Sequence, residues 1–147
     1  MERPIFLILN TKEMIDILHG AKYFTSLDLG NAFYQVELCD ESKLKTAFST
    51  KSAQYNFNRM PFGIAAAPVT FQKLMNKVLY HLNWKDAVVY LDDILMFSSN
   101  IQEHCKRTRK VCKRIKETGL KMRPNKCHFV SWSCDESGWY TNKEEEN

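Results

Sequence analysis

Two adjacent aspartates, Asp92 and Asp93, stand between two short apolar runs, residues 87–91 and 94–97. This layout is typical of a tight hairpin with both carboxylates at its tip. Neighbouring carboxylates repel each other and lose water there, so they need a cation or open solvent. Magnesium prefers hard oxygen ligands and is usually held by one or two carboxylates together with substrate phosphates. The pair is therefore a candidate metal site, although for an isolated Asp-Asp an ordinary polar turn is the commoner explanation.

A third carboxylate, Asp28, comes at the end of an aromatic and β-branched stretch, residues 23–29, which Gly30-Asn31 follows. This composition predicts a buried strand that ends in a turn. If that strand and the hairpin lie in one sheet, we expect the three acids to converge. Two metal ions held in this way can activate an attacking hydroxyl and stabilise a leaving pyrophosphate.

Other strands are predicted from the alternation of polar and apolar residues. Residues 34–38 and 55–59 both alternate in this way, which is the period of a half-buried strand. The second stretch faces residues 46–48 across a polar loop, so we expect these two segments to pair.

Three helices are predicted from the spacing of apolar side chains. A short amphipathic one precedes Gly20, and another begins at Pro68 and presents Phe71, Met75 and Val78 on one stripe. A third runs over residues 101–118, with Asn100 and Glu103 as a capping pair and Gly119 as its stop. Its expected apolar stripe consists of Ile101, Cys105, Thr108, Cys112 and Ile115.

The composition sets limits on the class of protein. A chain of 147 residues, 44% of them hydrophobic, suits one domain. The net charge of +4 indicates a polyanionic partner only weakly. The odd number of cysteines, with no Cys-x-x-Cys pair, argues against a disulfide framework and for reduced thiols in an intracellular protein, cytoplasmic or nuclear. No apolar run approaches the roughly 20 residues of a membrane span, so we expect no membrane partner.

Four motifs occur in order along the chain and carry a family resemblance. They are residues 21–29 around Asp28, Arg59-Met60-Pro61-Phe62-Gly63, Ala67-Pro68-Val69-Thr70-Phe71-Gln72 and Tyr90-Leu91-Asp92-Asp93-Ile94-Leu95. Together they resemble the reverse transcriptases of gypsy-type long-terminal-repeat retrotransposons, close to retroviral Pol. The resemblance runs from about Pro4 to Phe129.

The resemblance implies an α+β fold, the palm of a right-hand polymerase, in which helices back an antiparallel sheet. It implies part of the fingers and no thumb. We expect residues 1–130 to form this palm-like domain with truncated fingers. Residues 131–147 diverge from the family, and we expect a partly disordered tail there.

The same resemblance assigns roles at the acidic site. Asp28, Asp92 and Asp93 match the catalytic, metal-binding aspartates, and Leu29 matches a residue that lends its backbone carbonyl. The implied cofactor is Mg²⁺, two ions, with Mn²⁺ as a substitute. Implied partners are an RNA or DNA template with its primer, and deoxynucleoside triphosphates.

Four further residues match the nucleotide pocket of the family. Phe33 falls where an aromatic ring excludes the ribose 2′-hydroxyl; without the resemblance, a buried core aromatic is the better explanation. Phe62 and Gly63 match the loop that lines the pocket. Lys126 resembles a lysine near the triphosphate, although an exposed lysine in a basic stretch can equally have no role.

A basic helix gives two open interpretations. Its Lys and Arg residues can contact a nucleic-acid backbone, or they can form an ordinary solvated face, which we favour slightly. The candidates for nucleic-acid binding are Lys106, Arg107, Arg109, Lys110 and Lys113.

Family members also carry a fingers segment before the position of Pro4, and a thumb and usually a ribonuclease H region after that of Phe129. We therefore expect this chain to be a piece of a longer polyprotein and to be inert alone. Two alternatives stay open. One is an inactive remnant that binds nucleic acid or protein. The other is a nucleotidyl cyclase, which has a similar core but which residues 60–63 and 67–68 argue against.

Overall fold

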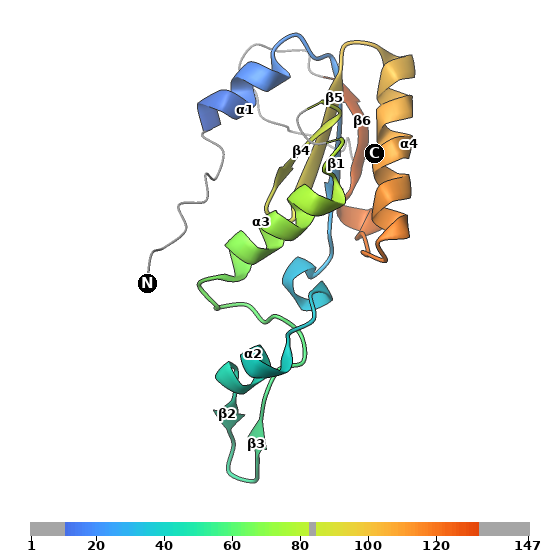
Figure 1. Cartoon of the computed structure of the whole chain (residues 1–147). Helices are drawn as coiled ribbons and strands as arrows, with labels where there is room; N and C mark the ends of the chain where they lie inside the picture. Colours follow the sequence, from blue (N-terminus) through green and yellow to red (C-terminus); the bar gives the residue numbers. More distant parts are fainter. Residues whose placement is uncertain (1–10, 83–84, 133–147) are drawn as a thin grey trace, which may run out of the picture.

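The computed structural model of the chain describes residues 11–82 and 85–132. Its centre is a four-stranded antiparallel sheet in the order β4-β5-β1-β6 (Figure 1). The strands are β1 (Tyr23–Asp28), β4 (Ala87–Tyr90), β5 (Asp93–Ser98) and β6 (His128–Trp132). Two helices pack on the sheet, α3 (Ala67–Val78) on β4 and α4 (Ile101–Glu117) on β5 and β1. The predicted α+β class, an antiparallel sheet backed by helices, is confirmed.

Strand β1 lies in the middle of the sheet, as its composition predicts. Leu27 and Leu29 are fully buried on either side of the half-buried Asp28. Because successive side chains of a strand point to opposite faces, the leucines anchor one face in the core and the aspartate points to the other. Strand β1 pairs with β5 from Tyr23↔Ser98 to Asp28↔Asp93.

The β4–β5 hairpin confirms the predicted layout but changes the position of its tip. Tyr90 pairs with Asp93, so the two loop residues are Leu91 and Asp92, and Asp93 is the first residue of β5. Two-residue hairpin loops favour a positive φ at their first central residue, and Leu91 has φ 55°. The side chain of Gln72 on α3 holds this turn: it accepts from the Leu91 N–H at 3.0 Å and donates to the Val89 carbonyl at 3.2 Å.

Helix α3 follows the prediction and α4 departs from it. In α3, Phe71, Met75 and Val78 are buried as predicted. In α4 the predicted apolar stripe is partly wrong: Ile115 is buried as predicted, but Ile101 and Cys105 are exposed, and His104 and Val111 are buried in their place. The buried face of α4 includes His104, a polar residue, so the spacing of apolar residues alone does not identify this face.

The caps of α4 agree with the prediction at two residues. The Asn100 side chain accepts from the Gln102 N–H at 2.7 Å, and Gly119 has φ 74° just beyond the end of the helix. Glu103 does not complete the predicted capping pair, because its carboxylate binds Arg107 instead.

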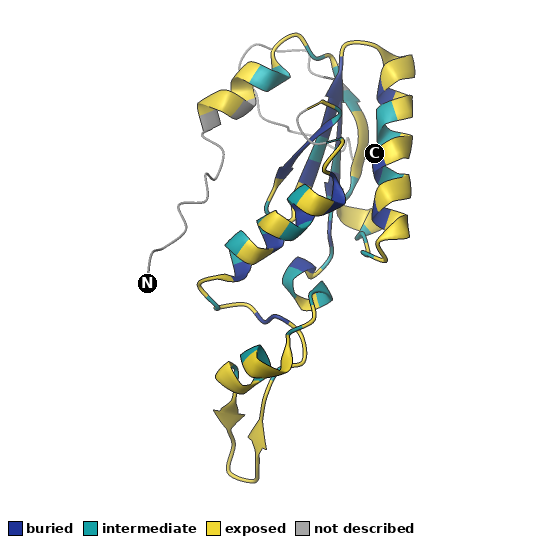
Figure 2. Ribbon diagram, in the orientation of Figure 1, coloured by how far each residue is buried: buried dark blue, intermediate teal, exposed yellow. Residues whose placement is uncertain are grey.

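A small subdomain extends from one end of the sheet (Figure 1) and consists of α2 (Asp40–Lys45), β2 (Phe48–Ser49) and β3 (Gln54–Tyr55), which are mostly exposed (Figure 2). The 3₁₀ turn η1 (Ala32–Gln35) joins it to the sheet and is largely covered. The predicted pairing across the polar loop is confirmed, since Phe48 lies opposite Tyr55, although the strand is shorter than expected. The strand predicted at residues 34–38 is wrong: a 3₁₀ turn takes its place, with one bridge between Glu37 and Arg59. Phe33, Val36 and Leu38 pack on the core from this turn rather than from a sheet.

The remaining elements frame the domain. Helix α1 (Thr11–Leu18) and its stop at Gly20, φ 82°, are confirmed. A 3₁₀ turn, η2 (Pro124–Lys126), leads into β6, which runs two residues beyond the predicted boundary at residue 130. The rest of the predicted tail lies outside the described residues. None of the described helices is long and apolar enough to span a membrane.

Candidate active site

One cavity, of about 300 Å³, lies at the end of β1. Six residues that the sequence analysis assigned to catalysis, metal binding or nucleotide binding line it: Asp28, Leu29, Phe33, Phe62, Asp92 and Lys126. Asn31 and Arg123, which sequence reasoning missed, line it as well. Asp93 and Gly63 are not part of its wall. The cavity therefore gathers residues that are up to 98 positions apart in the chain, from Asp28 to Lys126.

The backbone brings the three acids to one edge of the sheet. Asp28 pairs with Asp93 across β1 and β5, and the Leu29 N–H donates to the Asp92 carbonyl at 3.1 Å. The side chains are not pre-assembled, however: among the described residues, no three Asp, Glu, His or Cys side chains are close enough to hold a metal ion together.

Burial and neighbouring negative charges both act on the acids at this edge. Burial, followed by the negative charges of Asp92 and Asp28, raises the pKa of Asp93 above its usual value. Asp28 Oδ1 is buried and accepts no hydrogen bond within the described part of the chain. A hard divalent cation prefers carboxylate oxygens and relieves the repulsion between them. The residues present therefore fit Mg²⁺.

Arg123 is the cation nearest to Asp28 that the structure records. Its Nε lies 3.8 Å from Asp28 Oδ1, and its Nη2 donates to Asn31 Oδ1 at 3.2 Å. The backbone fixes the same contact, because the Arg123 N–H donates to the Asp28 carbonyl at 2.9 Å. The two residues are 95 positions apart, so only the fold reveals the pair. The basic stretch around Lys126 was the one signal available in the sequence.

An aromatic cluster closes the other side of the cavity. The ring of Phe33 lies 5.2 Å from that of Phe62 and 5.8 Å from that of Phe71, measured between centroids. Phe71 is buried and Phe62 is mostly exposed, so Phe33 joins the core to the cavity wall. Gly63 has φ 91°, and a Cβ built there meets nothing within 4 Å, so its backbone conformation accounts for the glycine.

The basic residues of α4 lie elsewhere, and none of them lines the acidic cavity. Lys106, Arg109, Lys110 and Lys113 are exposed. Arg107 differs: its guanidinium pairs with Asp86 at 3.2 Å and with Glu103, and donates to the Phe97 carbonyl at 2.8 Å. These contacts tie α4 to β5 and to the segment before β4.

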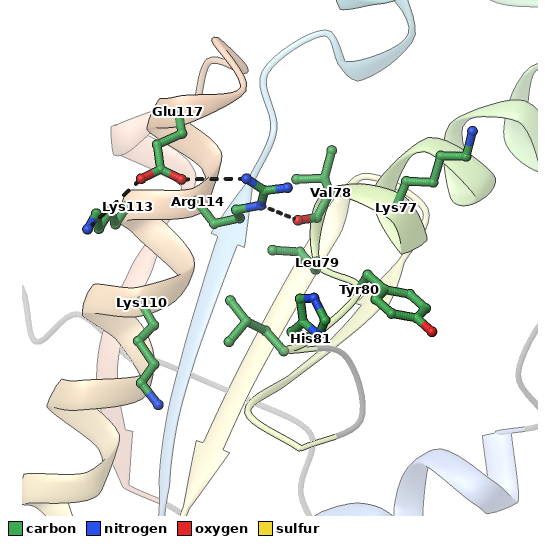
Figure 3. Close-up of a pocket in the computed structure, with 10 residues that line it drawn as sticks. Lys77, Val78, Leu79, Tyr80, His81, Lys110, Lys113, Arg114 and Glu117 are labelled. Carbon is green, nitrogen blue, oxygen red and sulfur yellow. Dashed lines mark hydrogen bonds and ion pairs between the residues drawn. The ribbon is translucent and has the colours of Figure 1, made fainter.

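A second cavity, of about 660 Å³, separates the end of α3 from α4 (Figure 3). Lys110, Lys113 and Arg114 of α4 and Lys77 of α3 are among the residues that line it. Arg114 Nε donates to the Val78 carbonyl at 2.8 Å, which joins the two helices. This cavity is the more basic of the two.

Carboxylates from a central strand and from a hairpin meet at one end of an antiparallel sheet, and two helices cover that sheet. This arrangement defines the palm of a right-hand polymerase. Comparison with known proteins agrees. The family described as "Reverse transcriptase (RNA-dependent DNA polymerase)" matches residues 1–144, and the chain belongs to this family.

Individual relatives are polyproteins of mobile elements. The Pol polyprotein of transposon 297 from Drosophila melanogaster is 44% identical over 121 residues, and that of transposon gypsy is 32% identical over 127. These matches cover 82% and 86% of this chain, but only 11% and 12% of the polyproteins. A solved foamy viral protease-reverse transcriptase in complex with an RNA/DNA hybrid matches with a TM-score of 0.67 and 29% identity, over 74% of this chain and 14% of that one. The predicted resemblance to gypsy-type reverse transcriptases is confirmed.

Proposed function

We propose that this chain contributes the palm of an RNA-directed DNA polymerase, which joins a deoxynucleoside triphosphate to the 3′-hydroxyl of a primer. One observation carries the proposal. A single cavity is lined by two carboxylates, an aromatic ring at the expected sugar position and a lysine at the expected triphosphate position, namely Asp28, Asp92, Phe33 and Lys126. The family membership of the chain makes this chemistry the first expectation.

The acids supply the metal site in this proposal. Asp28, Asp92 and Asp93 would hold two Mg²⁺ ions, or Mn²⁺ in their place, with the backbone carbonyl of Leu29 as a further ligand. Bound ions of this kind supply positive charge that activates the attacking hydroxyl and stabilises the leaving pyrophosphate. Two observations support this assignment: burial and the neighbouring acids raise the pKa of Asp93, and the buried Asp28 Oδ1 accepts no hydrogen bond within the described residues.

The other residues of the cavity position the nucleotide. Phe33, held between Phe62 and Phe71, would block the space that a ribose 2′-hydroxyl needs and so select deoxynucleotides. Gly63, with its left-handed backbone, shapes the loop that carries Phe62. The ammonium group of Lys126 would protonate the leaving pyrophosphate.

A template and primer, RNA or DNA, are the proposed nucleic-acid partners. The foamy viral enzyme, which was solved with an RNA/DNA hybrid, supports this choice. Lys106, Arg109, Lys110 and Lys113 offer exposed positive charge that a phosphate backbone could contact. Arg107 contributes less in this proposal, because its guanidinium is already engaged by Asp86 and Glu103.

The test is a chimera in which this chain replaces the matching segment of the transposon 297 polyprotein. The chimera should extend a DNA primer on an RNA template with Mg²⁺, and Asp92→Asn should reduce the rate by at least about a thousandfold, since metal-held charge supplies several kcal/mol. Asp40→Asn is the matched control, because this carboxylate is exposed on α2. Equal rates for the Asp92→Asn chimera and the unchanged one would refute the proposal.

A further inference from the structure

Arg123 has no role in the proposed reaction so far, although it lines the cavity. We infer that Arg123, steadied by Asn31, forms a phosphate-binding site for the triphosphate of the nucleotide, and that its guanidinium takes the place of the metal beside Asp28 when the cavity holds no cation. This inference rests on the proposed function. It assigns a role to a cationic residue of the cavity wall, and it predicts that the binding of metal and the binding of triphosphate are coupled.

The stem of Arg123 is fixed in place. Its backbone N–H donates to the Asp28 carbonyl at 2.9 Å. A Cβ built on Gly30 would lie 3.3 Å from both Cβ and Nε of Arg123, so the side chain runs directly over this glycine. A larger residue at position 30 would push the guanidinium away. The turn after β1 therefore sets the direction in which Arg123 points.

The guanidinium retains unused hydrogen-bonding capacity. It has five N–H donors, and within the described residues one of them is used, by Nη2 on Asn31 Oδ1 at 3.2 Å. Its distance of 3.8 Å from Asp28 Oδ1 is too long for a hydrogen bond, although the charges attract. The side chain is one-third exposed, toward the cavity that it lines. The planar fork of arginine matches phosphate oxygens well.

The charges of the cavity fall into two groups that suit a metal-bound triphosphate. Asp28 and Asp92 provide negative charge, and Arg123 and Lys126 provide positive charge. The two cations lie on one short turn, because the Lys126 N–H donates to the Arg123 carbonyl at 3.0 Å. A cavity of about 300 Å³ admits one small ligand, which favours a nucleotide triphosphate over a polymer backbone.

Metal binding and triphosphate binding should be coupled, because the Arg123 guanidinium and a metal ion would both lie beside Asp28. A divalent cation at Asp28 would compete with the Arg123 guanidinium for the same carboxylate. The guanidinium, still anchored by Asn31, would then be free to bind phosphate oxygens. Metal and triphosphate should therefore bind more tightly together than separately, by the same factor in either order.

The test uses the 147-residue chain and two simple probes, Mn²⁺ detected by its paramagnetic resonance and inorganic tripolyphosphate measured by calorimetry. Arg123→Gln should bind Mn²⁺ alone about threefold to fivefold more tightly, because a competing charge is lost. It should bind tripolyphosphate in the presence of Mn²⁺ at least about tenfold more weakly, as expected for lost charge-assisted hydrogen bonds. Arg123→Lys should retain part of the triphosphate affinity.

Lys121→Gln is the matched control. Lys121 lies two residues before Arg123 and carries the same charge, but its side chain is exposed and does not line the cavity. It should leave both affinities unchanged. Opposite shifts of the two affinities in Arg123→Gln support the inference, and parallel losses or no change would overturn it. Circular dichroism checks that each variant is folded. Asp28→Asn separates the two proposals, because unchanged Mn²⁺ binding in that variant contradicts the metal site of the proposed function. The phosphate site at Arg123 is tested independently by comparing the tripolyphosphate affinities of Arg123→Gln and the wild type without metal.

Discussion

His104 is fully buried on α4, and replacing it with phenylalanine should destabilise the sheet that carries the acidic site. The imidazole lies in a chain of four hydrogen bonds. Ser98 Oγ donates to the Asn100 carbonyl at 3.1 Å, so it must accept from His104 Nδ1 at 3.0 Å. The other ring nitrogen, Nε2, then accepts from Thr25 Oγ1 at 2.7 Å, while Thr25 Oγ1 accepts from the Val130 N–H at 3.1 Å. The neutral Nδ1–H tautomer satisfies every member of this chain.

The magnitude follows from the groups that His104→Phe leaves behind. The hydroxyls of Thr25 and Ser98 are both buried, and each loses one partner. A buried polar group without its partner costs about 1–3 kcal/mol, so the free energy of unfolding should fall by about 2–5 kcal/mol. For a chain of this size that corresponds to a decrease of roughly 5–15 °C in Tm. Since domains are stable by about 5–15 kcal/mol in total, the variant should still fold.

Thermal and urea unfolding followed by circular dichroism measure this loss. His19→Phe is the control, because His19 is exposed after α1 and should change the Tm little. A loss below about 0.5 kcal/mol in His104→Phe, the usual range for surface substitutions, would refute the hydrogen-bond argument.

The same network predicts a pH dependence. Burial, and to a smaller extent the charge of Arg107, lowers the pKa of His104 below 6.5. The unfolded chain therefore binds the proton more readily than the folded chain does. The stabilisation is complete above pH of about 6.5 and is lost as the pH falls from there through the lower folded pKa. The urea midpoint of the wild type should fall more steeply over this window than that of His104→Phe, and equal slopes would contradict the assignment.

Further predictions concern the acidic edge of the sheet, the aromatic ring of Phe33 and the basic helix α4. Asp93→Asn should raise the Tm in EDTA by up to about 3 °C, because it removes a like charge, and should reduce the stabilisation by added Mn²⁺; a lower Tm in EDTA would contradict this. In the active chimera, Phe33→Val should increase ribonucleotide incorporation at least about tenfold relative to deoxynucleotides, and unchanged sugar selectivity would make Phe33 a core aromatic only. Lys113→Glu should lower the slope of log affinity against log salt for a primer–template by about 1, whereas Lys22→Glu should not, and equal slopes would favour a solvated face.

The sequence predicted best what depends on local periodicity. Strand β1, the β4–β5 hairpin and α3 have strong patterns, and each exists within a few residues of its expected bounds. The prediction failed at residues 34–38, because the 3₁₀ turn η1 extends to Gln35 and only the residues after it pair, in one bridge, with the segment around Arg59. It also misplaced the packing face of α4, because His104 is polar and its burial depends on Thr25 and Ser98 from other strands.

In the candidate site, too, the sequence predicted the residues that belong to local motifs and missed those that only the fold brings there. The sequence could single out Asp28, Asp92, Phe33 and Lys126 because the motifs that contain them are local and distinctive, and the fold places all four in one cavity. Arg123 carries no such motif. Its contact with Asp28 exists because η2 returns the chain to the end of β1 after α4, and local patterns do not determine this return.

The acidic edge of the sheet combines a strained backbone with repulsion between carboxylates, and the surrounding core fixes the backbone there. Leu91 has a positive φ, which costs a branched residue about 1–2 kcal/mol, and Asp93 has its pKa raised by burial and by its acidic neighbours. Gln72 offsets part of this cost through two hydrogen bonds to the hairpin. Fully buried Leu27 and Ile94 face each other across β1 and β5, one residue from Asp28 and Asp93 respectively. The carboxylates therefore cannot relieve their repulsion by moving the backbone, so a cation is the most direct way to stabilise this edge.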